Sequence, residues 1–265
     1  MSARPARSIG SFAASASPAG NGPPDSHSAI LEQLRGKLQA AVMPMDERRV
    51  VATRFDTLNH LLPDRGIRAG TVVEWVSGEP GCRTSTVAFA AASRLLKQPG
   101  ALAVVDPLHC LCAAALPQVG IPLSRLLLVR PERTSNASTF VSEYRLSGAV
   151  RTHALWALEQ LARCTGVAVA FTWIDRLSAT AQRRLQLAVE RSGTTIFLIR
   201  PSSVLHQPTW ADLRFLVQAD GGGAAETRAA SPLQVQLIRS RNSVHQQGRT
   251  RLECEYETSV VSEVS

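Results

Sequence analysis

The chain has 265 residues, of which 45% are hydrophobic and 19% are charged. This length and composition suit one substantial core with tails and exclude two full domains. Lys and Arg outnumber Asp and Glu by 29 to 21, which gives a formal net charge of +8. A basic excess of this size favours acidic partners such as nucleic acid, although basic faces also keep proteins soluble.

The five cysteines are odd in number and form no CxxC pair, which predicts the reduced thiols of a cytoplasmic protein. The six histidines show no spacing typical of a zinc site. No apolar run approaches the roughly 20 residues that cross a bilayer, and the N-terminal stretch is too polar for a signal peptide. We therefore expect a cytoplasmic protein with no metal site and no membrane contact.

Residues 1–27 are dominated by Ser, Ala, Gly and Pro, a composition that buries too little apolar surface to order itself, and they are predicted to be a disordered tail. Residues 28–43 predict an amphipathic helix, which Ser28 caps and Pro44 stops. This helix is expected to dock on the folded domain or on a partner. Its apolar stripe consists of Ile30, Leu31, Leu34, Leu38 and Val42.

Strand and helix patterns alternate from residue 71 onward. The predicted strands cover 71–76, 101–105, 126–129, 167–174 and 194–199. The predicted helices cover 84–97, 108–116, 150–164 and 178–191. Alternation of this kind builds a mostly parallel sheet with helices on both faces.

Three later segments alternate apolar and polar residues, as half-buried antiparallel strands do. They cover 213–219, 233–239 and 249–257, and a glycine-rich link at 220–231, predicted to be mobile, separates the first two. We therefore predict an α/β domain over 50–258 and a flexible C-terminus at 259–265.

The segment SGEPGCRT, residues 77–84, lies between a predicted strand and a predicted helix. In this layout the loop amides and the helix N-terminus offer hydrogen-bond donors to an anion. The full phosphate-loop motif is GxxxxGK[ST], whose lysine reaches the terminal phosphates. Its defining positions hold Ser77, Cys82, Arg83 and Thr84, of which only Thr84 matches. The candidate phosphate-binding residues are Gly78, Gly81, Arg83 and Thr84.

Arg83 keeps the positive charge of the missing lysine but is larger and presents a planar fork, so the replacement is not conservative. Two interpretations of the loop remain open. It is either a site that binds ATP without efficient hydrolysis, or a strand-to-helix turn whose glycines serve backbone geometry alone.

Three segments resemble the RecA core, in the same order along the chain. They are RFDTLNHLLPDRGIRAGTVVEWVSG at 54–78, VVDPLHCLCAAALPQVGIPLSRLLLVRP at 104–131, and VAVAFTWIDRLSATAQRRLQLAVERSGTTIFLIRP at 167–201. The third is similar to the ImuA family of RecA-related accessory proteins for mutagenic DNA repair, through its W-x-x-R-L-S, RRLQLA and LIRP elements. The resemblance spans Arg54 to Arg239.

This resemblance implies a RecA-like P-loop core with a mostly parallel central sheet flanked by helices, plus C-terminal antiparallel strands. It implies an accessory role in damage-induced translesion synthesis, within the SOS response. The implied partners are an ImuB-like, polymerase-related protein and an error-prone replicative polymerase. Single-stranded DNA and RecA are further candidate partners, and ATP is the candidate cofactor.

The same resemblance exposes gaps in the catalytic set. RecA proteins carry a catalytic glutamate two residues after the aspartate that ends the second strand, and here Leu108 follows Asp106 at that spacing. A leucine cannot orient an attacking water. Alignment without gaps places Trp173 where RecA proteins have a metal-associated aspartate, and Asp175 comes two residues later. The resemblance therefore implies a non-catalytic descendant of an ATPase, with no catalytic residue and no metal site.

Two groups of arginines are candidates for DNA binding, one on the predicted helix at 178–191 and one around the polar connection RNSVHQQG. For the helix group an ordinary solvated basic face is the preferred interpretation, and for the second group the alternative is an ordinary exposed hairpin. Two other functions remain open: a working DNA-dependent ATPase that uses Arg83, Thr84, Asp106 and Asp175, and a damage-induced inhibitor of cell division. The candidate DNA-binding residues are Arg183, Arg184, Arg239, Arg241, Arg249 and Arg251.

Overall fold

The computed structural model describes residues 48–97, 99–132, 146–220, 230–241, 248–255 and 261–263. The predicted tail at 1–27 and the predicted amphipathic helix at 28–43 lie outside these residues. The centre of the glycine-rich link and the polar connection at 242–247 also lie outside them.

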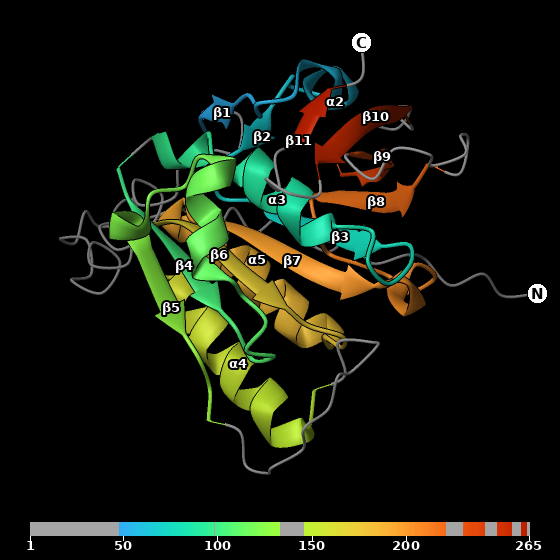
Figure 1. Cartoon of the computed structure of the whole chain (residues 1–265). Coiled ribbons are helices and arrows are strands. Elements are labelled where there is room, and N and C mark those ends of the chain that lie inside the picture. The colour runs from blue at the N-terminus through green and yellow to red at the C-terminus, as the bar shows by residue number, and fades with distance from the viewer. Residues whose placement is uncertain are drawn as a thin grey trace, which may run out of the picture. The chain divides into compact units, whose positions relative to one another are not determined.

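A single large sheet organises the domain, and the described strands follow the order β11-β10-β9-β8-β3-β7-β6-β4-β5 (Figure 1). The six strands from β8 to β5 are parallel, whereas β9, β10 and β11 are added antiparallel. The parallel strands are β3 (Val72–Ser77), β4 (Ala101–Val105), β5 (Leu126–Val129), β6 (Val167–Trp173), β7 (Thr195–Pro201) and β8 (Leu213–Ala219). The antiparallel ones are β9 (Ala230–Ser240), β10 (Gly248–Glu255) and β11 (Val261–Glu263). The predicted fold class is confirmed.

Helices cover both faces of the sheet because the crossover from β3 to β4 runs in one direction across it and those from β5 to β6 and from β6 to β7 run in the other, and each crossover is right-handed. One face packs against α3 (Thr84–Ala92), and the other packs against α4 (Gly148–Ala162) and α5 (Ala179–Ser192), so that α3 and α5 lie on opposite sides (Figure 1). The hydroxyls of Ser147 and Ser178 cap α4 and α5 by accepting hydrogen bonds from the amides of Val150 and Ala181. No helix in the described ranges is long and apolar enough to cross a membrane.

Aromatic side chains fill the layer between the sheet and α3. Trp75 stacks on Phe215 with ring centroids 4.5 Å apart, and Phe89 of α3 stacks on Phe171 at 3.9 Å. Strands buried on both faces need continuous apolar sequence, which is why the segments that form β3, β6 and β7 show no polar alternation.

A small unit precedes β3. It consists of β1 (Val50–Val51), which pairs antiparallel with β2 (Ile67–Arg68), and the helix α2 (Asp56–Leu61) between them. The helix α2 lies against β10. The beginning of the RecA-like segment therefore contacts the C-terminal antiparallel strands.

Three sequence-based boundaries differ from the structure. The helix expected at 108–116 is replaced by a 3-10 helix at Ala113–Val119, because the carboxylate of Asp106 accepts the amides of Cys110 and Leu111 and holds this stretch as a loop. The helix expected at 84–97 ends at Ala92 and is followed by a 3-10 turn at Leu95–Lys97. Within the C-terminus predicted to be flexible, Val261–Glu263 pairs with β10 as β11, a strand too short to show a repeating pattern.

Candidate functional site

The loop SGEPGCRT joins β3 to α3, as predicted. The amide of Gly78 donates to the carbonyl oxygen of Val217 at 2.8 Å, and a Cβ at Gly78 would lie 2.4 Å from Cγ of Gln218. Gly81 has a φ of +85°, which favours glycine. Within the described residues, the amides of Gly81 and Cys82 have no hydrogen-bond acceptor. The loop backbone therefore keeps two donors that an anion could use.

The side chains of the loop turn toward the protein. Arg83 has a left-handed φ of 51°, and its Nη1 lies 3.3 Å from Sγ of Cys254 in β10. Thr84 is buried, and its Oγ1 lies 3.0 Å from Sγ of Cys82. The guanidinium that stands in for the phosphate-loop lysine is thus directed at the antiparallel end of the sheet.

Trp173, at the end of β6, lies against the first turn of α3. Its indole Nε1 donates to Oγ of Ser85 at 2.9 Å, and the residue is 3% exposed. Its ring packs edge-on against Phe171 at 5.4 Å and lies 6.1 Å from Phe89. The position at which the resemblance implies a metal-associated aspartate therefore holds an apolar side chain that hydrogen-bonds the second residue of α3.

Asp106 and Leu108 have contacts of their own at the end of β4. The carboxylate of Asp106 accepts hydrogen bonds from the amides of Cys110 and Leu111 and forms an ion pair with Arg130 at 3.1 Å. Leu108 packs against the apolar clusters on both sheet faces. Burial, and then the charge of Asp106, raise the pKa of the Cys110 thiol to about 12.

The carboxylate of Asp175 is also paired with an arginine. Both of its carboxylate oxygens accept hydrogen bonds at 3.0 Å from the guanidinium of Arg151 in α4, and the residue is 7% exposed. A bidentate arginine–carboxylate contact of this kind holds the carboxylate in one orientation and also compensates its charge. Asp106 and Asp175, the two acids required by the ATPase alternative, are each paired with an arginine.

A buried charge cluster, which the sequence analysis missed, crosses the centre of the sheet. Glu74 in β3 pairs with Arg200 in β7 at 2.8 Å and with Arg214 in β8 at 2.6 Å. These three residues are 0%, 0% and 4% exposed. Arg200 also donates to the carbonyl oxygen of Asp175 at 3.1 Å. One carboxylate therefore compensates two buried guanidinium groups, on the side of the sheet that α4 and α5 cover.

The two candidate DNA-binding arginines of α5 both have partners. The guanidinium of Arg183 lies 5.2 Å from the ring centroid of Trp210, and its Nη1 donates to Oε1 of Gln186 at 2.9 Å. Arg184 forms an ion pair with Glu159 of α4. Both arginines lie on the α4–α5 side of the sheet, away from the phosphate loop.

The second candidate set does not gather at one place. Arg241 lies near Asp212 and Glu190, at 3.6 and 3.9 Å. Arg251 pairs with Asp220 at 2.6 Å, whereas Arg239 and Arg249 are exposed on β9 and β10. Arg241 thus reaches α5 through Glu190, whereas Arg239, Arg249 and Arg251 lie on β9 and β10. The second set is therefore divided, and only Arg241 lies beside the helix that carries the first set.

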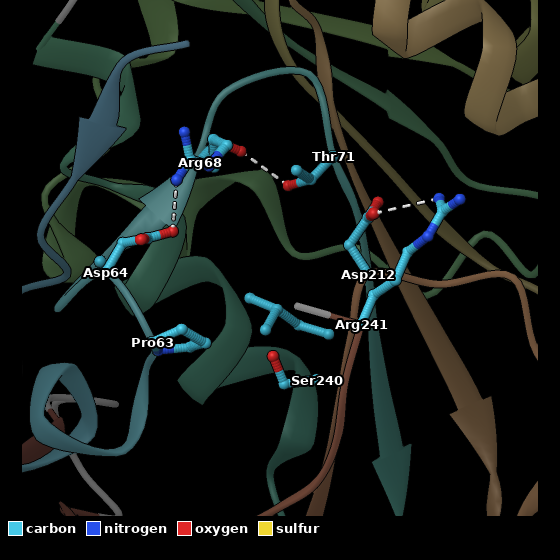
Figure 2. A pocket seen from close by; sticks show the side chains of 9 residues that line it. Pro63, Asp64, Arg68, Thr71, Asp212, Ser240 and Arg241 are labelled. Carbon is cyan, nitrogen blue, oxygen red and sulfur yellow. Dashed lines mark hydrogen bonds and ion pairs between the residues drawn. The ribbon is translucent and has the colours of Figure 1, made fainter. Parts of the chain in front are cut away.

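A small pocket lies at the opposite end of β3 from the phosphate loop (Figure 2). Its volume of about 30 Å³ is far below the roughly 300 to 1,000 Å³ of pockets that bind small molecules. Figure 2 shows the ion pairs of Arg68 with Asp64 and of Arg241 with Asp212 on its two sides. The pocket is too small for a nucleotide.

Asp212, which lines this pocket, should make the stability of the protein depend on pH. Burial raises its pKa above the ordinary value of 3.8, against the hydrogen bond from the amide of Val72 and the charge of Arg241. Below pH 3.8 the carboxyl group is protonated in both the folded and the unfolded state, and burial has no ionic cost. As the pH rises toward the raised pKa, the unfolded chain loses the proton more readily, so the wild type loses stability.

Asp212→Asn is therefore expected to gain stability relative to the wild type as the pH rises from about 4, and to keep a constant advantage, of about 1 kcal/mol or less, above the raised pKa. The measurement is urea unfolding of both proteins from pH 3.5 to pH 7. An advantage that shrinks as the pH rises would contradict the assigned direction.

The described residues do not fit a magnesium-nucleotide site of the RecA type. Mg²⁺ in such sites is held by one or two carboxylates together with phosphate oxygens, and here the carboxylates of Asp106 and Asp175 are each paired with an arginine. The carboxylate of Glu79 in the loop accepts the amide of Ala219, and Trp173 presents a donor where a metal needs an oxygen ligand.

Neither a protein-family model nor a curated protein sequence matches the chain. Among solved structures, the chain is similar to the crystal structure of the RadB recombinase, with a TM-score of 0.56 and 14% sequence identity. The match covers 81% of this chain and 99% of the RadB chain. The strand order, the parallel core and this match together show that the chain has a RecA-like α/β fold.

Proposed function

We propose that the chain is a non-catalytic, RecA-like accessory protein of damage-induced mutagenic translesion DNA synthesis. Its role is to recruit or regulate an error-prone polymerase complex through an ImuB-like partner. The RecA-like fold supports the general class, and the similarity of residues 167–201 to the ImuA family supports the specific role.

The contact between Trp173 and Ser85 carries the non-catalytic part of the proposal. Phosphoryl transfer depends on a cation at the phosphates, a residue that positions the nucleophile and a bound metal ion. Here Arg83 is directed at Cys254, Leu108 packs against the edge of the core, and Trp173 is hydrogen-bonded at the expected metal side. Three separate parts of the catalytic apparatus are replaced, so the loop supports anion binding at most.

Mutation frequency after DNA damage tests this proposal. A deletion strain is expected to show reduced damage-induced mutagenesis, and both the wild type and Arg83→Ala are expected to restore it, since no ATP hydrolysis is needed. Restoration by the wild type alone, with DNA-stimulated ATP turnover that disappears in Arg83→Ala, would replace the proposal with the ATPase alternative.

Two further outcomes decide between recruitment and other roles. The purified chain is expected to retain an ImuB-like partner in a pull-down at micromolar concentration. Unchanged mutagenesis in the deletion strain, together with filamentation when the chain is expressed, would overturn the translesion role and favour inhibition of cell division.

A further inference from the structure

The outer side of α4 and α5 gathers large apolar side chains. Trp156 of α4 is 65% exposed, Leu187 of α5 is 37% exposed, and Trp210, in the connection between β7 and β8, is 42% exposed. By contrast, Trp75 and Trp173 are 0% and 3% exposed. Three of the five exposed large hydrophobic residues in the described ranges belong to this layer. Exposed apolar side chains on adjacent elements mark candidate interaction sites, and the contacts of Arg183 with Trp210 and of Arg184 with Glu159 link these elements. We call this side the α4–α5 surface.

The α4–α5 surface is basic. Between residues 146 and 212 the acidic residues are Glu159, Asp175, Glu190 and Asp212, and none of them is exposed. Glu159 and Asp175 are paired with Arg184 and Arg151. The exposed arginines of the same stretch are Arg163, Arg176, Arg184 and Arg191. The outward charge of this layer is therefore positive.

Trp210 is held in place before any partner arrives. Its backbone amide donates to Oε1 of Gln182 at 2.9 Å, and the guanidinium of Arg183 lies over its ring at 5.2 Å. Gln186, which is fully buried, in turn accepts from Arg183. An aromatic side chain that is already fixed loses little conformational entropy on binding. Trp and Arg are also the residues most enriched among those that dominate binding energy at protein interfaces.

We propose that the α4–α5 surface docks an acidic segment of a partner protein that also carries aliphatic side chains. The aliphatic side chains would cover Trp156, Leu187 and the free face of Trp210, while the carboxylates would pair with Arg163, Arg176 and Arg191, since Arg184 is already paired with Glu159. Because α3 and the phosphate loop lie on the other face of the sheet, the proposal does not depend on nucleotide binding or on the translesion role.

The contacts favour a protein over a nucleic-acid strand. Single-stranded nucleic acid is bound by free aromatic faces beside unpaired cations. Here one face of Trp210 is covered by Arg183, the charge of Arg184 is engaged by Glu159, and Leu187 offers no ring to a base. A protein segment can use all of these side chains at once.

The experiment titrates the full chain with a synthetic amphipathic peptide of Glu and Leu residues and follows tryptophan fluorescence and calorimetric heat. Saturable binding is expected, and Trp156→Ala, Trp210→Ala and Arg183→Glu should each weaken it about tenfold or more. A peptide with Gln in place of Glu should also bind about tenfold more weakly. Circular dichroism checks that each variant is folded.

Two matched controls lie elsewhere on the protein. Leu127→Ala removes an exposed apolar side chain from β5, and Arg249→Glu reverses an exposed charge on β10; each should change the affinity by less than about twofold. No binding in the millimolar range, or equal binding to the variants at Trp156 and Trp210, would overturn the proposal. Binding of oligothymidine that those two variants abolish would assign the surface to nucleic acid instead.

Discussion

Glu74→Ala is expected to destabilise the protein by about 3 to 5 kcal/mol, enough to unfold much of it at moderate temperature. The carboxylate of Glu74 is the shared partner of Arg200 and Arg214, which are almost fully buried. Its removal leaves two guanidinium groups in an apolar layer without a counter-charge, and burial of an unpaired charge costs far more than a lost surface ion pair.

Urea unfolding measures this loss, and two variants separate its causes. Glu253→Ala, on the more open strand β10, should change stability by less than about 0.5 kcal/mol. Replacing Glu74, Arg200 and Arg214 together by methionine should recover most of the stability, because an apolar cluster of similar volume has no charge to desolvate. A triple variant that is as unstable as Glu74→Ala would show that packing, and not charge, holds this part of the sheet.

Trp173→Asp is expected to destabilise the protein by about 4 kcal/mol or more, and to produce no ATP turnover. The substitution places an aspartate where the RecA resemblance implies a metal-associated one. However, the position is 3% exposed and packed against Phe89 and Phe171. A carboxylate there would lose the aromatic contacts and would place a charge among buried apolar side chains.

Thermal unfolding and a DNA-stimulated ATPase assay are the measurements for this variant. Trp173→Phe is the matched control, because it keeps an aromatic ring but removes the indole donor to Ser85, at an expected cost of about 1 kcal/mol. If Trp173→Asp folded normally and hydrolysed ATP, the rest of the site would be competent, and the claim that three separate parts of the catalytic apparatus are replaced would fail.

The order of the elements and the place of the loop could be predicted from the sequence. The apolar runs at 101–105, 167–174 and 194–199 are strands because a parallel strand covered on both faces has no polar side. Ser178 and Gly193 mark the ends of α5 through a side-chain cap and a φ of +80°. These signals are local, and the sequence shows them directly.

The contacts at the site could not be predicted in this way, because they join residues that are far apart in the chain. Glu74 and Arg214 lie 140 residues apart, and Trp173 and Ser85 lie 88 apart. A signal for the first pair was present, since a charged residue within each of three apolar strand segments needs a partner. For the hydrogen bond of Trp173 there was no such signal, since tryptophan is ordinary in a core strand.

The strand order also affects how the chain can fold. The first strand of the sheet, β3, pairs only with β7 and β8, both of which come more than 100 residues later. During synthesis on the ribosome, β3 has neither neighbour until the chain has been made through Pro201, and it lacks the second until Ala219. Non-local pairing of this kind slows folding and exposes apolar strands to aggregation. We therefore expect the nascent chain to depend on chaperones until β8 emerges.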